Sequence, residues 1–167
     1  MRNFLLDTCI WPYWFNPNRL EHAKVKSRVE SLAGNSVLGI SIITWGEVVY
    51  GHHVSGKRGH PIQAEYLQFI KSKGPKTFEI DIHTANTYGE LRARLFDKFA
   101  PKDKRKKNLR PEQLVDPVTS KELGIQENDL WIVAQAIVRG LTLVTHDKLT
   151  HIREIAGSQL HIEDWAS

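Results

Sequence analysis

The chain has 167 residues with 41% hydrophobic and 25% charged side chains, which excludes a disordered or membrane-embedded protein. Its lone cysteine, Cys9, excludes an intramolecular disulfide and any zinc site built from several cysteines. The net charge of +4 favours an anionic partner. At this length we expect one domain, spanning 1–167.

No secretory or membrane-spanning segment is predicted. Asp7 interrupts the N-terminal apolar run where the core of a signal peptide would lie. No stretch approaches about 18 uninterrupted apolar residues. We therefore expect a cytoplasmic protein that does not associate with membranes.

Apolar and β-branched runs predict the strands. Buried strands are expected at 4–6 and 37–43, and the pattern repeats at 78–80 and 141–144. A further strand at 160–162 would form an edge. Each run is separated from the next by a segment long enough to hold a helix.

Helices are predicted between these strands. One apolar stripe consists of Val25, Val29, Leu32 and Ala33, and a second runs from Ala85 to Phe99. The segment 130–138 is apolar nearly all round and predicts a buried helix. Because strands and helices alternate, we expect an α/β fold in which a parallel sheet carries helices on both faces.

Residues from about 100 to 124 form an insertion between two of these helices. It contains a basic run, KDKRKKNLR at 102–110, in which six basic side chains accompany one acid, Asp103. Such a run can bind a nucleic-acid backbone, or it can be a solvated loop that binds nothing. The sequence leaves both interpretations of the insertion open.

Four acidic residues stand near the ends of predicted strands. Asp7 follows the first strand directly, and Asp147 follows the fourth after two polar residues. Glu47 comes in the first turn of the helix after the second strand, and Asp129 begins the buried helix. Because the carboxyl ends of parallel strands share one edge of a sheet, we expect the four carboxylates to converge there.

Each acid, considered alone, also has a structural explanation. Residues 44–47 have the spacing of a capping box, and 128–129 are of the types that cap helices. Asp147 could begin a helix, and Asp7 could be a turn residue. None of these explanations accounts for the convergence of all four on one edge.

Carboxylates on neighbouring strands repel one another. Two charges about 5 Å apart repel by about 3 kcal/mol at an effective dielectric of 20, so the cluster requires a cation or bound protons. Oxygen donors without a paired-histidine motif suit Mg²⁺ or Mn²⁺ better than zinc. Hydrolysis of a phosphodiester is the chemistry that such a site supports.

Four segments carry a resemblance to a known family: FLLDTCIW at 4–11, SIITWGEVVYG at 41–51, IDIHTANTYGELRARL at 80–95 and ENDLWIVAQAIVRGLTLVTHD at 127–147. In this order and at these spacings they resemble the PIN-domain family, and most closely its VapC-type toxins, which are ribonucleases. The resemblance covers nearly the whole chain. It implies a three-layer α/β/α sandwich with a mainly parallel central sheet.

The resemblance further implies metal-dependent cleavage of RNA that leaves 3′-hydroxyl and 5′-phosphate ends. A cognate antitoxin is the implied partner, and a homodimer is common in the family. The metal-site acids that it carries over are Asp7, Glu47, Asp129 and Asp147. Thr145 would assist by hydrogen-bonding a carboxylate or the scissile phosphate, and Thr8 has a weaker assignment. The family often has asparagine where this chain has Cys9, which we expect to be a small buried hydrophobe lacking that polar contact.

Two other functions compete with the nuclease. Aspartyl-phosphate phosphatases need a second aspartate two positions after the first, where this chain has Cys9. A non-catalytic PIN-like module that binds RNA or acts as a scaffold is the stronger alternative. A pure binding module has no need for four mutually repelling carboxylates, so we favour the nuclease.

Other residues have open roles. The aromatic cluster at 11–15 is expected to pack in the core, although exposed members could stack on RNA bases or bind an antitoxin. Asp81 is expected in a turn or a helix cap. His146 has a modest claim as a phosphate contact.

Overall fold

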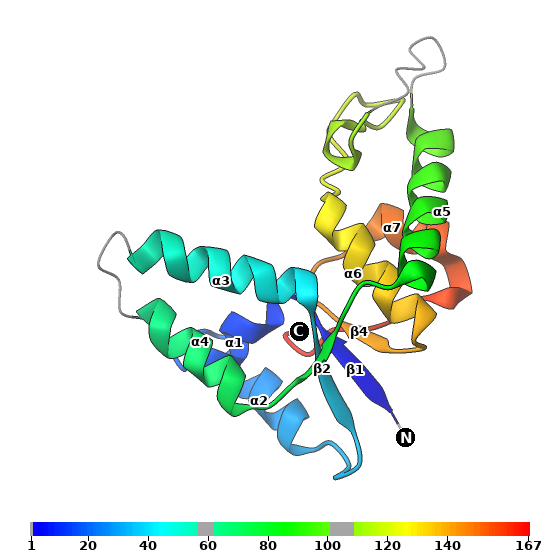
Figure 1. Ribbon diagram of the computed structural model, residues 1–167. Coiled ribbons are helices and arrows are strands. Elements are labelled where there is room, and N and C mark those ends of the chain that lie inside the picture. Colours follow the sequence, from blue (N-terminus) through cyan, green and yellow to red (C-terminus); the bar gives the residue numbers. More distant parts are fainter. Residues whose placement is uncertain (1, 57–61, 101–108) are drawn as a thin grey trace.

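The computed structural model describes residues 2–56, 62–100 and 109–167, and in them a single sheet lies at the centre (Figure 1). Its strands are all parallel and run in the order β3-β2-β1-β4-β5. They are β1 (Asn3–Leu6), β2 (Val37–Ser41), β3 (Lys76–Phe78), β4 (Thr142–Val144) and β5 (His161–Glu163). The predicted parallel sheet is confirmed.

Helices cover both faces of this sheet, which confirms the predicted three-layer α/β/α fold. Figure 1 shows α1 to α4 on one side of the sheet and α5 to α7 on the other. The helices are α1 (Ile10–Phe15), α2 (His22–Glu30), α3 (Ile42–Gly56), α4 (Ile62–Ser72), α5 (Ile82–Phe99), α6 (Glu127–Val138) and α7 (Thr150–Ala156). Short 3₁₀ turns lie at Pro111–Gln113 and Gly157–Gln159.

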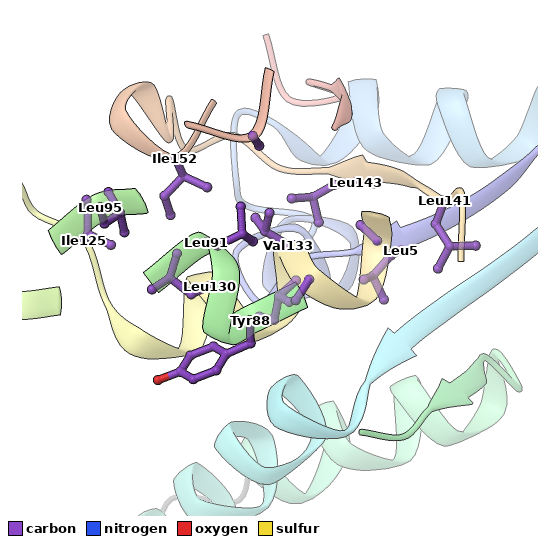
Figure 2. Packing of buried hydrophobic residues seen from close by; sticks show 14 of the residues in the cluster. Leu5, Tyr88, Leu91, Leu95, Ile125, Leu130, Val133, Leu141, Leu143 and Ile152 are labelled. Carbon is purple, nitrogen blue, oxygen red and sulfur yellow. The ribbon is translucent and has the colours of Figure 1, made fainter. Parts of the chain in front are cut away.

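The side chains of β1 point alternately to the two faces of the sheet and so contribute to two layers of the core. Leu5 packs with the cluster that α5, α6 and α7 form, which also contains Leu91, Val133 and Leu143 (Figure 2). Phe4 and Leu6 point to the other face and join the cluster of α1, α2 and α4. Successive side chains of a strand point to opposite faces, so one apolar run holds both layers together.

The second predicted strand is shorter than the sequence pattern indicates. We expected a strand at 37–43, but Ile42 and Ile43 already form the first turn of α3. The hydroxyl of Ser41 accepts a hydrogen bond from the backbone N–H of Ile43 at 3.0 Å, which satisfies a donor at the helix start. This local bond outweighs the strand preference of two β-branched residues.

The helix before this strand is also shorter than its predicted apolar stripe, because α2 ends at Glu30 and leaves Leu32 and Ala33 outside it.

Only the first part of the predicted insertion lies outside the described residues. Residues 101–108, which hold nearly all of the basic run, fall outside the described residues. The segment after them packs on the helices, with Leu114 and Ile125 buried in the core cluster and a bridge between Val115 and Glu122. None of the described helices is long and apolar enough to cross a bilayer.

The strand order defines where a ligand can bind. From the central strand β1 the chain adds β2 and β3 on one side and β4 and β5 on the other. The carboxyl ends of β1 and β4 therefore flank a topological switch point, where open parallel sheets form their ligand crevices.

Candidate active site

All four sequence-predicted acids line one cavity of about 700 Å³ at this switch point. They come from four separate elements. Asp7 directly follows β1, Glu47 lies in the second turn of α3, Asp129 is the third residue of α6, and Asp147 lies in the loop between β4 and α7. The structure thus brings together the residues that we expected at one edge, although Glu47 is one turn further into its helix than its expected place.

Asp7 is the most buried of the four acids, with 6% of its surface exposed. Its backbone N–H donates to the carbonyl of Val144 at 2.9 Å, which continues the pairing of β1 with β4. Its carboxylate accepts hydrogen bonds from the Thr145 hydroxyl and the Thr8 backbone N–H, both at 2.7 Å. Burial raises the pKa of Asp7, these two bonds lower it, and the charges of the neighbouring acids raise it further.

Thr145 connects two of the acids. Its side chain is buried, and its Oγ1 donates to Asp7 while accepting a hydrogen bond from the backbone N–H of Asp147 at 3.1 Å. Its own N–H donates to the carbonyl of Glu163 at 3.0 Å. One hydroxyl therefore fixes the Asp7 carboxylate against the loop that carries Asp147, and the sheet holds that hydroxyl in place.

Glu47 is held by two donors from opposite sides. The Thr8 hydroxyl donates to its Oε2 at 2.5 Å, and the Asn128 amide donates to its Oε1 at 2.7 Å. The expected capping box with Thr44 is wrong, because α3 begins at Ile42 and leaves Thr44 inside the helix. The Asn128 contact was not foreseen; its only signal in the sequence is its position beside Asp129 at a helix start.

Asp129 has both of the roles that the sequence offered. As the third residue of α6 it accepts a hydrogen bond on Oδ2 from the backbone N–H of Gln126 at 3.1 Å, which caps the helix. It also lines the cavity. Burial raises the pKa of Asp129 to about 6; the capping bond opposes this shift, and the charges of the three other acids add to it.

Asp147 lies next to Asp7 and does not begin a helix. Ligand atoms of Asp7, Cys9 and Asp147 lie within 4.8 Å of one another. Helix α7 starts at Thr150, after Leu149 adopts a left-handed backbone with φ of 45°. The alternative of a helix-capping Asp147 is therefore wrong.

Cys9 is partly exposed in the cavity and is not the buried hydrophobe that we expected. Its thiol lies 3.8 Å from Asp7 Oδ2 and accepts a hydrogen bond from the His146 backbone N–H at 3.5 Å. Burial and the nearby Asp7 charge raise the pKa of Cys9 to about 12, so the group is a protonated thiol at neutral pH. It provides a weak contact to Asp7 where an asparagine would provide a stronger one.

The donor set fits a hard divalent cation. Carboxylate oxygens are the ligands that Mg²⁺ and Mn²⁺ prefer, and the protonated Cys9 thiol is a poor competitor for such ions. Part of the rise in the pKa of Asp7 and Asp129 comes from the other acids. A cation among them would relieve this repulsion.

The side chains of the remaining candidates make their contacts outside the acid cavity. Trp11 and Trp14 are buried in the core, as expected. Asp81 caps α5 by accepting a hydrogen bond from the Thr84 N–H at 2.8 Å, which confirms its predicted role. The ring of His146 pairs with Asp164 at 3.0 Å.

A sequence model of the PIN domain matches residues 4–157. No curated protein matches the chain.

Solved structures resemble the chain over nearly its full length. VapBC2 from Rickettsia felis, bound to a DNA fragment from their promoter, has a TM-score of 0.68 at 25% identity and covers 98% of both chains. VapBC-1 from nontypeable Haemophilus influenzae has a TM-score of 0.67 at 20% identity and covers 99% of both. VapBC-5 from Mycobacterium tuberculosis, a member of the VapBC family of toxin-antitoxin systems, has a TM-score of 0.55 at 18% identity and covers 98% of both. At 20% and 18% identity, the likeness to VapBC-1 and VapBC-5 shows that the chain has the same fold as these structures.

Proposed function

This chain belongs to the PIN-domain family, and we propose that it is a metal-dependent endoribonuclease, the toxin of a type II toxin–antitoxin system. The observation that carries the proposal is the convergence of four acids from four elements on one cavity. Helix capping accounts for Asp129 alone, since Glu47 and Asp147 occupy no cap position. Asp7 is buried, and part of the rise in its pKa and in that of Asp129 comes from the other acids of the cavity, as is typical of a catalytic metal site.

The proposed cofactor is Mg²⁺ or Mn²⁺. The residues that would hold it are Asp7, Glu47, Asp129 and Asp147. When bound, such an ion supplies activation of the attacking water and neutralisation of charge at the scissile phosphate.

The residues around the acids keep the cavity in one arrangement. Thr145 fixes Asp7, while Thr8 and Asn128 fix the two oxygens of Glu47. The capping bond to Gln126 restrains Asp129. Because these bonds form within the folded protein, the acids need little reorganisation before they bind an ion.

Apolar side chains form part of the cavity wall. Leu123, Ile125 and Ile132 line it beside the acids. These side chains exclude water from one side of the cluster, which strengthens electrostatic interactions inside. In this mechanism they give the bound phosphate a less polar surrounding than bulk solvent does.

The proposed partners are an RNA substrate, a cognate antitoxin and a second copy of the chain. The antitoxin proposal is supported by the likeness to VapBC2 from Rickettsia felis. We propose that the chain acts in the cytoplasm and that 1–167 act as a single PIN-like domain. Size-exclusion chromatography with light scattering measures whether the chain is a homodimer.

The test of the function is cleavage of an end-labelled cellular RNA pool with Mn²⁺, with Mg²⁺ and with EDTA. We expect discrete products that require metal and disappear in Asp129→Asn. A matched control is Asp97→Asn, the same substitution at an exposed acid of α5 outside the cavity, which retains cleavage. Binding of RNA without cleavage under every metal condition would instead identify a non-catalytic RNA-binding module.

A further inference from the structure

A second hollow adjoins the acid cavity through shared residues. Lys148 and Thr150, which line the acid cavity, also line a hollow of about 770 Å³ on α7 together with Arg153 and Glu154. This hollow, which we call the α7 path, has the cations Lys148 and Arg153 on its border and leads away from the four carboxylates.

The α7 path has a positive charge next to the acids. Lys148 and Arg153 are exposed, and no carboxylate in the described part of the chain lies within 4.0 Å of either cation. Among the described residues that line the α7 path, the one acid is Glu154, and it forms an ion pair with Lys98. Two uncompensated cations therefore stand beside a cavity lined by four acids.

The lining of the α7 path distinguishes between possible ligands. Lys148, Thr150, Arg153 and Glu154 all carry polar or charged ends, and none offers the buried aromatic or aliphatic anchor typical of protein interfaces. Two cations and a hydroxyl are instead suited to phosphate oxygens. A phosphodiester chain in the acid cavity would also extend into the neighbouring hollow, because the two share Lys148 and Thr150.

We propose that the α7 path binds the sugar-phosphate backbone of single-stranded RNA next to the scissile phosphate, with Lys148 and Arg153 each contacting a phosphate. This inference rests on the proposed nuclease function. The acid cavity repels an incoming polyanion, and the two cations offset that repulsion just outside it. They add affinity without reading sequence, because phosphates are the same at every nucleotide.

The test is a double variant, Lys148→Gln with Arg153→Gln, titrated with a fluorescein-labelled single-stranded RNA oligonucleotide in EDTA over a range of salt concentrations. Each phosphate contact on a single strand contributes about 0.7 to the slope of log K against log salt, so we expect the slope to fall by about 1.4. At 0.1 M salt this corresponds to about 25-fold weaker binding. In Mn²⁺ the same variant should cleave with a raised KM and a nearly unchanged kcat.

The matched control removes the same charge elsewhere. Lys24 on α2 and Lys71 on α4 are exposed and lie on the other side of the sheet from α7 (Figure 1). Lys24→Gln with Lys71→Gln should keep the slope and the KM of the wild type. Equal weakening of RNA binding in both double variants, or wild-type binding in both, would overturn the proposed role of the α7 path. If the wild type still cleaves RNA, the proposed nuclease function would stand. A wild type that neither binds nor cuts RNA would instead overturn the proposed function and this inference with it.

Discussion

Replacing Thr145 by valine removes one hydroxyl from the centre of the candidate site and changes almost nothing in volume. The side chain is 1% exposed, so water cannot replace the lost group. The substitution removes the 2.7 Å hydrogen bond to Asp7 Oδ2 and the acceptor for the Asp147 N–H. Because Asp147 is exposed, solvent can satisfy its N–H, and the loss at Asp7 dominates.

The magnitude follows from the type of bond. A hydrogen bond to a charged group contributes about 1.5 to 3 kcal/mol net, so the free energy of unfolding should fall by about 2 kcal/mol. The Thr145 bond lowers the pKa of Asp7, so its removal raises that pKa further. Loss of a residue that orients a metal ligand typically costs about 10- to 100-fold in metal affinity or activity, which is the expected loss in Mn²⁺-dependent cleavage.

Thr145→Ser is the matched variant, because it keeps the hydroxyl and loses a methyl group. It should cost about 0.8 kcal/mol of stability and retain most of the activity. Denaturant unfolding, Mn²⁺ titration calorimetry and single-turnover cleavage measure the three quantities. Equal losses of metal affinity and cleavage in the serine and valine variants, or wild-type behaviour in both, would refute the assigned role of the hydroxyl.

Three further predictions follow from other contacts. Asn128→Ala frees one oxygen of Glu47, so cleavage should fall about 10-fold with little change in melting temperature; an unchanged cleavage rate would contradict the role of this contact. Mn²⁺ at 100 times its Kd should stabilise the protein by about 2.7 kcal/mol, seen as a higher melting temperature; no shift would argue against a preformed metal site. Burial raises the pKa of Glu163, but hydrogen bonds from Trp165 and Arg28 outweigh it and the pKa is lowered from 4.5. The stability lost in Glu163→Gln should therefore be full above pH 4.5 and should decline as the pH falls from 4.5 through the lowered pKa of Glu163, and a loss independent of pH would contradict this.

The convergence of the acids could be predicted from the sequence because short apolar runs mark where β1 and β4 end. Asp7 and Asp147 stand close after those runs, and parallel strands place both at one edge. Glu47 and Asp129 follow from the same rule, since each lies near the start of a helix at that edge.

The contacts that orient the acids could not be predicted in the same way. Thr8, Glu47 and Asn128 are far apart in the sequence, and only the sheet register and the packing of α3 near α6 bring them together. Local capping patterns were misleading at Glu47, where the Ser41 hydroxyl rather than Thr44 serves the helix start. At Asp129 the capping pattern and the site coincide on one carboxylate.

Helix α1 was missed for a local reason. Its six residues are too few to show a helical period, and Pro12 suggests a turn. A proline is tolerated in the first turn of a helix, where its missing N–H has no intrahelical acceptor. Burial of Trp11 and Trp14 against the sheet provides the stabilisation that the local sequence does not display.

The most direct test of the account is the chemistry of the ends that cleavage leaves. In the proposed reaction, attack by water would break the P–O3′ bond, so the products should carry 3′-hydroxyl and 5′-phosphate groups and should form only with Mg²⁺ or Mn²⁺. Ligation and phosphatase sensitivity of the fragments, with mass spectrometry of a short oligonucleotide, identify both ends. Products with 2′,3′-cyclic phosphate, or cleavage that persists in EDTA, would contradict metal-dependent hydrolysis by Asp7, Glu47, Asp129 and Asp147.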